Sequence, residues 1–139
     1  MSERRDVYAY FWIQGFDDPP EDISTLMAVT PSRVERVGES RWFGALATMN
    51  RWELLSPLNR GEHLLQDYLE ALLPILEARA SVVRSLASLY SAGINCVGYF
   101  YGSNPGLHLS ASLIKRLAEL ELAVDFDLYN CGEESAAST

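Results

Sequence analysis

Cysteines, long apolar runs and an apolar leader are scarce or absent in this sequence. Its 139 residues contain two cysteines, Cys96 and Cys131, and no CxxC motif, so the sequence does not predict a disulfide framework. No stretch reaches membrane-spanning length without a charge, and residues 1–6 lack the apolar core of a secretory signal. We therefore expect a cytoplasmic protein whose two thiols are buried and reduced.

Basic residues are also few. The chain has 11 basic and 19 acidic residues, for a net charge of −8, and Lys115 is its only lysine. An acidic domain repels the phosphates of nucleic acids and of anionic membranes, so neither is expected as a partner. A basic protein, a cation or a neutral small molecule remains possible. The alternative is that the charge only keeps the protein soluble.

The remaining composition is that of one globular domain. Hydrophobic residues make up 48% of the chain and charged residues 22%, close to the average for folded domains, so a core of ordinary size is expected. The whole chain, residues 1–139, has the length of a single domain, and no repeat or linker divides it. We expect an ordered core from about residue 7 to 131 and a frayed polar tail after it.

Three segments, residues 7–16, 94–101 and 122–129, alternate between two kinds of side chain, which is typical of strands. Side chains on a strand point to opposite faces in turn, so one face of each segment is apolar and belongs to the core. The residues expected on this core face are Val7, Ala9, Phe11, Ile13, Ile94, Cys96, Phe100, Val124, Phe126 and Leu128.

Apolar residues at helical spacing predict four helices. The first follows Asp18, which is placed to cap it, with Pro19 at the first helical position. The second and third are separated by Pro74, because proline ends or kinks a helix. The fourth begins after a cap at Ser110 or Ser112. Each predicted helix therefore has a recognisable boundary residue.

Residues 31–60 have a weaker pattern, which we interpret as a hairpin of strands 41–49 and 51–56 with Trp42 and Trp52 as buried anchors. The resulting order is strand, helix, two strands, two helices, strand, helix, strand. This order favours an α+β fold with a mixed, mainly antiparallel sheet and helices packed on one face. A ferredoxin-like core with an extra helix–strand unit is the topology that fits it best.

The face opposite the core carries the main candidate site. If the three alternating strands are neighbours, their second faces form one aromatic and acidic surface. Such a surface could bind a basic or aromatic ligand by stacking and cation–π contact, or form a homodimer interface, or be covered by the chain's own loops. Its residues are Tyr8, Tyr10, Trp12, Tyr99, Tyr101, Asp125, Asp127 and Tyr129.

A second candidate combines His108 with Asp125 and Asp127, since imidazole and carboxylates can hold a metal or transfer protons. No HxH, HExxH or DxDxDG metal motif supports it, and a histidine before a helix more often bonds to loop backbone. The GxSxG motif of serine hydrolases and the lysine of a phosphate-binding loop are also missing. We therefore assign no catalytic residue, no metal and no cofactor.

Several short motifs, taken in order, resemble one bacterial family, catalogued as domain of unknown function 4279. The resemblance covers residues 8–129, and the family consists of small stand-alone proteins. It implies no established activity, cofactor or catalytic residue. The motifs that carry it are Thr30-Pro31-Ser32-Arg33, Gly38-Glu39, Trp52-Glu53-Leu54, Leu72-Leu73, Pro105-Gly106-Leu107-His108-Leu109-Ser110 and residues 122–129.

Charge and the aromatic face together favour a non-enzymatic binding protein of the bacterial cytoplasm. It would pair with itself through the aromatic face or neutralise a basic protein, as an immunity protein does. A small enzyme or a metal- or ligand-binding domain built on His108, Asp125 and Asp127 is the alternative.

Overall fold

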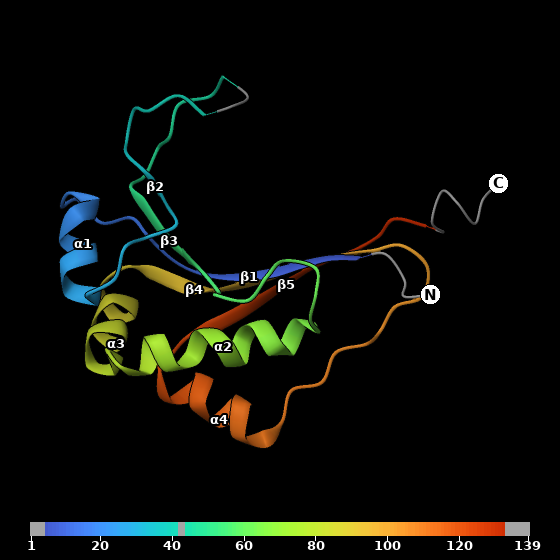
Figure 1. Cartoon of the computed structure of the whole chain (residues 1–139). Coiled ribbons are helices and arrows are strands. Elements are labelled where there is room, and N and C mark those ends of the chain that lie inside the picture. Colours follow the sequence, from blue (N-terminus) through green and yellow to red (C-terminus); the bar gives the residue numbers. More distant parts are fainter. Residues whose placement is uncertain (1–4, 42–43, 133–139) are drawn as a thin grey trace.

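The computed structural model describes residues 5–41 and 44–132 (Figure 1). This part of the chain contains four helices and five strands. None of the described helices is long and apolar enough to span a membrane. In chain order the elements are β1 (Arg5–Gln14), α1 (Pro20–Met27), β2 (Arg33–Glu35), β3 (Arg51–Leu55), α2 (Leu65–Glu77), α3 (Ala80–Leu89), β4 (Ser91–Phe100), α4 (Ala111–Glu119) and β5 (Ala123–Asn130).

The five strands form one mixed sheet in the order β2-β3-β1-β4-β5. β1 lies antiparallel between β3 and β4, β2 is antiparallel to β3, and β5 is parallel to β4. The first four strands therefore have the 4-1-3-2 order of a ferredoxin-like core, and α4 provides the crossover that a parallel neighbour requires. The predicted α+β class and the ferredoxin-like core with an added helix–strand unit are both confirmed.

The helices lie on one face of the sheet, with α2, α3 and α4 below it in Figure 1. α2 packs on β1 and β4, α3 on β4 and α1, and α4 on α2. The alternate residues Val7, Ala9, Phe11 and Ile13 of β1 are at most 1% exposed beneath this layer. Trp52, predicted as an anchor, is fully buried and meets Phe11 edge to face at 6.2 Å.

Two helix boundaries differ from the prediction. Pro19 rather than Asp18 is the N-cap of α1, because Pro20 occupies the first helical position. α2 continues through Pro74 to Glu77, because the burial of Leu73 and Leu76 on the same helix outweighs the cost of this proline. Ser110 caps α4 as expected, its hydroxyl accepting a 3.1 Å hydrogen bond from Leu113 N–H.

The hairpin partner of β3 is β2, not residues 41–49 as predicted. The described residues of the connection between β2 and β3, 36–41 and 44–50, instead contain one isolated bridge, between Ser40 and Leu46. Asn50 fixes the end of this connection next to β3. Its side chain donates a hydrogen bond to the Phe16 carbonyl (2.8 Å) and accepts one from Val37 N–H (2.9 Å). Trp42, the other predicted anchor, lies outside the described residues.

The two cysteines have different environments. Cys96 is fully buried between the sheet and the helices, and this burial raises the pKa of its thiol to about 12. Cys131 is exposed, so the expectation that both thiols are buried is wrong. The reason is its place just beyond β5, an edge strand whose Leu128 and Tyr129 are themselves 45% and 47% exposed. The predicted frayed tail falls on residues 133–139, outside the described residues.

Candidate interaction surface

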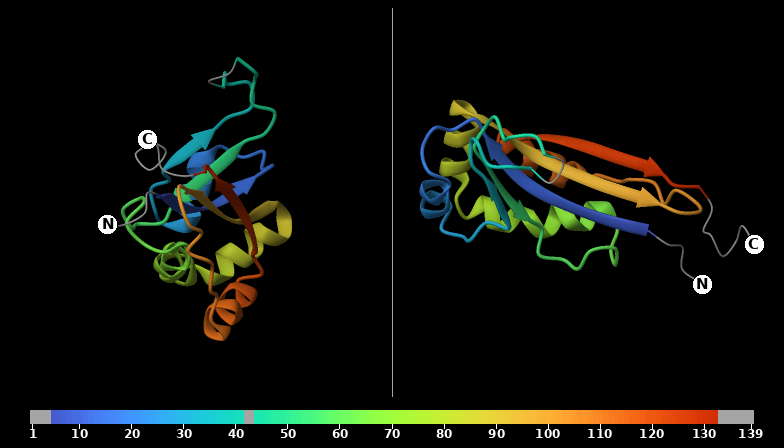
Figure 2. Two further views of the ribbon diagram at one scale, coloured as in Figure 1. Left: turned by 90° about the vertical axis from the view of Figure 1, so that its right-hand side faces the viewer. Right: turned by 90° about the horizontal axis from the view of Figure 1, so that it is seen from above.

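The helix-free face of the sheet, which we call the open face, brings most of the predicted site residues together. It is the face seen in the right-hand view of Figure 2. Tyr101 lies one residue beyond β4, in the connection to α4. The strand residues that alternate onto the open face are Asp6, Tyr8, Tyr10, Trp12, Gln14, Arg33, Glu35, Arg51, Glu53, Leu55, Ser91, Gly93, Asn95, Val97, Tyr99, Ala123, Asp125, Asp127 and Tyr129.

Tyr99 and Tyr129 form an aromatic stack on this face. They are direct partners in the parallel register of β4 and β5, and their ring centroids lie 4.8 Å apart with an interplanar angle of 12°. Tyr129 remains 47% exposed. Stacked tyrosine rings at an accessible edge strand offer apolar contact area with little conformational freedom, and such rings contribute strongly to binding energy at interfaces.

Tyr10 and Trp12 are held by one amide. The indole N–H of Trp12 donates to the side-chain oxygen of Asn95 (3.0 Å), and the nitrogen of the same amide donates to the Tyr10 hydroxyl (2.8 Å). Gly93 lies opposite Trp12 in the register, and a Cβ there would be 3.2 Å from the indole. The absence of a side chain at Gly93 therefore gives the indole room across β4.

Arginines cover two of the predicted rings. The guanidinium of Arg60 lies 3.9 Å from the centroid of Tyr8 and makes hydrogen bonds of 2.7 and 2.9 Å with Asp6. Burial raises the pKa of the Tyr8 hydroxyl, and Arg60 partly offsets this shift. Arg51 lies 4.9 Å from the ring centre of Trp12. The cation–π contacts expected from a ligand are thus made, at these two rings, by the chain's own arginines.

Charge is divided across the open face. On the β2–β3 side, arginines and glutamates form a ladder in which Arg51 bonds Glu53 at 2.5 Å and Arg33 bonds Glu35 at 3.1 Å. A hydrogen bond from Arg41 holds the pKa of Glu35 below its usual value.

On the β5 side of the open face, Asp125 and Asp127 are exposed, and neither forms an ion pair within the described part of the chain. The β2–β3 side of the face therefore carries arginines paired with glutamates, whereas the charged side chains that β5 places on the face are both acidic.

The second candidate site is not assembled. Asp125 and Asp127 lie on the open face, whereas His108 is exposed in the segment that descends to α4 on the helix side (Figure 1). Among residues 5–41 and 44–132, no three histidine, cysteine or acidic side chains gather closely enough to hold a metal ion. The geometry thus provides no support for metal binding or acid–base chemistry at these three residues.

The sequence did not identify the polar partners that organise the rings, namely Asn95, Arg51 and Arg60. Alternation along β4 is enough to place Asn95 on the open face, but it does not indicate that the amide bonds both Trp12 and Tyr10. The positions of the two arginines could not, because Arg51 reaches Trp12 across the β1–β3 pairing and Arg60 reaches Tyr8 from the connection after β3.

Fold and surface together define a small α+β domain with a ferredoxin-like core and one uncovered sheet face. The family described as Domain of unknown function (DUF4279) matches residues 5–131, and the chain belongs to that family. No curated protein and no solved structure matches this chain.

Proposed function

We propose that this protein is a non-enzymatic interaction protein of the bacterial cytoplasm whose working surface is the open face. The observation that carries the proposal is the accessible stack of Tyr99 and Tyr129 beside the exposed carboxylates of Asp125 and Asp127, which form no ion pair with another described residue. Rigid rings next to charges form anchors that cost little conformational entropy on binding. Asn95 adds to this rigidity by fixing two further rings before a partner arrives.

The partner that suits the whole face is a second copy of the chain. A two-fold axis that lies between the two sheets and runs parallel to the strands would place the acidic β5 side of one copy over the β2–β3 side of the other, which contains the arginines. Asp125 and Asp127 would then meet Arg33 or Arg60. The strands β1 to β5 have 10, 3, 5, 10 and 8 residues, so at about 3.3 Å per residue and about 4.8 Å between strands the sheet presents about 570 Å². One partner gives about 800 Å² to a stable interface, so the flanking connections would also have to contribute.

A protein with a basic surface is the second candidate partner. The net charge of −8 favours it, because an acidic protein attracts basic partners over long distances. Asp125 and Asp127 would be the contact residues for both partners, so the same variants test both.

Sedimentation velocity measures the self-association. We expect the wild-type chain to form a dimer at micromolar concentration and the double variant Asp125→Arg/Asp127→Arg to be monomeric. The matched control Glu70→Arg/Glu119→Arg makes the same change in charge on the exposed surfaces of α2 and α4, and it should remain a dimer. Circular dichroism verifies that each variant is folded.

A monomeric wild-type chain would exclude the second copy and leave the basic partner. Affinity capture from a bacterial lysate then tests that partner, which should be retained by the wild type and the Glu70→Arg/Glu119→Arg control and lost with Asp125→Arg/Asp127→Arg. If the wild type is monomeric and captures nothing that depends on these aspartates, the proposed function is wrong.

A further inference from the structure

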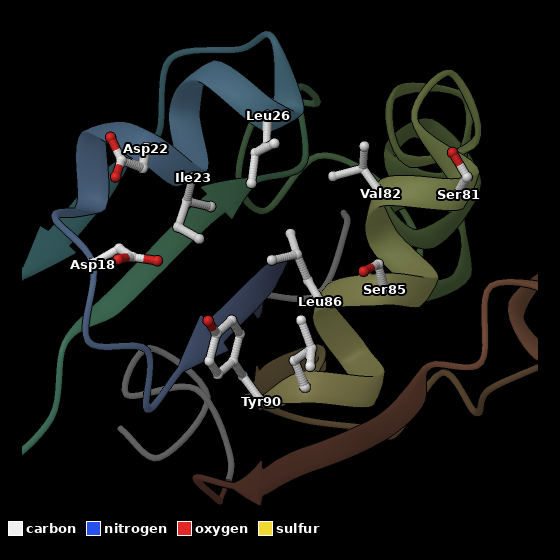
Figure 3. Close-up of a pocket in the computed structure, with 10 residues that line it drawn as sticks. Asp18, Asp22, Ile23, Leu26, Ser81, Val82, Ser85, Leu86 and Tyr90 are labelled. Carbon is white, nitrogen blue, oxygen red and sulfur yellow. The ribbon is translucent and has the colours of Figure 1, made fainter.

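A groove of about 360 Å³ separates α1 from α3, on the helix side of the sheet (Figure 3). Its floor is formed by Ile23 and Leu86, which are 2% and 4% exposed. Leu26 on α1 and Leu89 on α3 border it and remain 48% and 67% exposed. Both helices thus present large aliphatic side chains to solvent where they face each other, and these side chains extend the apolar core outward.

The groove has charge of one sign. Asp18 and Asp22 line it on the α1 side, and Ser81 and Ser85 lie across from them on α3 (Figure 3). Neither aspartate forms an ion pair within the described residues, and no lysine, arginine or histidine lines the groove. A ligand that fits it must combine an apolar surface with positive charge at one end.

We propose that this groove binds an amphipathic, basic helix of a protein partner. The partner's apolar residues would enter between Leu26 and Leu89, and its arginine or lysine side chains would pair with Asp18 and Asp22. This is the helix-in-groove mode, in which side chains at positions i, i+4 and i+7 act as anchors.

The dimensions agree with such a helix. With a rise of about 1.5 Å per residue, α1 and α3 are roughly 12 and 15 Å long. Anchors seven residues apart span about 10.5 Å, so three of them fit along the groove. The groove lies on the opposite side of the sheet from Tyr99 and Tyr129 and shares no residue with the open face. The proposal is therefore independent of the proposed function.

The probe is a synthetic 14-residue helical peptide with leucines at i, i+4, i+7 and i+11 and arginines on one flank, added to the full-length protein. Methyl NMR spectra should show saturable shifts of Leu26, Val82 and Leu89, with micromolar affinity that weakens as salt is added. A scrambled peptide and a peptide with glutamates in place of the arginines should bind at least tenfold more weakly. Equal binding of all three peptides would overturn the proposal.

Variants locate the site. Leu89→Glu should weaken binding at least tenfold, and Asp18→Asn/Asp22→Asn about threefold to tenfold with a smaller salt dependence. The control Leu46→Glu changes another aliphatic residue that is 59% exposed but lies in the β2–β3 connection, and it should leave affinity unchanged. Similar losses in Leu46→Glu and Leu89→Glu would show that the peptide does not use the groove.

Two other occupants give distinct results, each of which overturns the proposal. If Leu89→Glu changes the sedimentation of the protein alone, the groove contacts a second copy. If decylammonium shifts the same methyl groups while the peptide does not, the groove binds a small apolar cation. The open-face variant Asp125→Arg/Asp127→Arg should leave peptide affinity unchanged, which separates failure of this proposal from failure of the proposed function.

Discussion

Trp12 and Asn95, which are 83 residues apart in sequence, are joined by a 3.0 Å hydrogen bond from the indole N–H to the side-chain amide oxygen. The bond links two adjacent strands across the open face. Because the amide nitrogen is engaged with Tyr10, the amide has one favourable orientation, and both aromatic rings are fixed relative to each other. A partner binding here would meet a surface that is already ordered.

Replacing Asn95 should therefore affect both stability and ring order. In Asn95→Ala the indole N–H and the Tyr10 hydroxyl lose their partners in a half-buried site, which should lower the free energy of unfolding by about 1 kcal/mol. Urea denaturation measures this loss, and the indole N–H resonance of Trp12 should move in ¹H–¹⁵N spectra. An unchanged midpoint together with an unmoved resonance would contradict the described bond.

The stack of Tyr99 and Tyr129 should depend on the aromatic ring of Tyr129 and not on its hydroxyl group. Tyr129→Ala should destabilise the domain by about 0.5–1.5 kcal/mol, the usual contribution of an aromatic pair. Tyr129→Phe keeps the ring and should cost much less. Thermal or urea unfolding compares the two variants, and equal losses would show that the ring contact is not what stabilises this edge.

The thiols should react at very different rates. At pH 8 the native protein is expected to react promptly with one equivalent of a thiol reagent, at Cys131, which is exposed. Cys96 should react only after unfolding, because it is buried and its pKa of about 12 leaves almost no thiolate. Cys131→Ser should abolish the prompt reaction. Prompt modification of two thiols per native chain would be incompatible with the packing of β4.

The pair formed by Glu77 and Arg116 predicts a pH dependence of stability. Hydrogen bonds of 2.9 and 2.6 Å from Arg116 hold the pKa of Glu77 below its ordinary value of 4.5. The ionised form therefore favours the folded state, and its contribution is complete above about pH 4.5 and lost as the pH falls through the lower, folded pKa. Because the pair is partly exposed, this contribution should not exceed about 1 kcal/mol.

Arg116→Ala should accordingly reduce the difference in unfolding free energy between pH 7 and pH 3. Lys115→Ala is the control, since Lys115 pairs with Glu119 at 3.8 Å on a largely exposed surface. Urea titrations over this pH range measure both variants. An identical pH profile for wild type and Arg116→Ala would mean that the ion pair between α2 and α4 is not formed in solution.

Gly98 should not tolerate a side chain. A Cβ at this position in β4 would lie 2.6 Å from the ring of Phe100, so Gly98→Ala should cost about 1–3 kcal/mol through overpacking. The same substitution in a Phe100→Leu background should cost less, because the smaller side chain can move aside. A double-mutant cycle measures this coupling, and a zero coupling energy would place the strain elsewhere.

Most of the topology was predictable from the sequence, because period-two alternation identified β1, β4 and β5 and the element order fixed the class. The error at residues 41–49 has a physical cause. This segment looks like a strand, but β3 has only two edges, and both are occupied, by β1 and β2. Local pattern does not reveal such competition. The helix boundary predicted at Pro74 is wrong because of another non-local effect: the packing of α2 outweighs the backbone hydrogen bond that proline cannot donate.

The candidate surface was predictable only in part. Alternation was enough to place Tyr8, Tyr99 and Asp127 on the same side once their strands were neighbours. The Tyr99–Tyr129 stack depends on the register between β4 and β5. The contact of Arg60 with Tyr8 depends on how the connection after β3 packs against β1. The groove between α1 and α3 depends on how two separate helices approach each other, so no local signal indicates it.

The position of β1 has a consequence for how the chain is made. It precedes the other four described strands in the chain, yet it becomes the central strand of the sheet, bonded to β3 on one side and β4 on the other. Its second neighbour, β4, begins only at Ser91. β1 therefore cannot complete its pairing until more than half of the 139 residues have been synthesised. During translation the edge of β1 that faces β4 therefore stays unpaired longer than the edge that faces β3, and an unpaired strand edge is prone to aggregation.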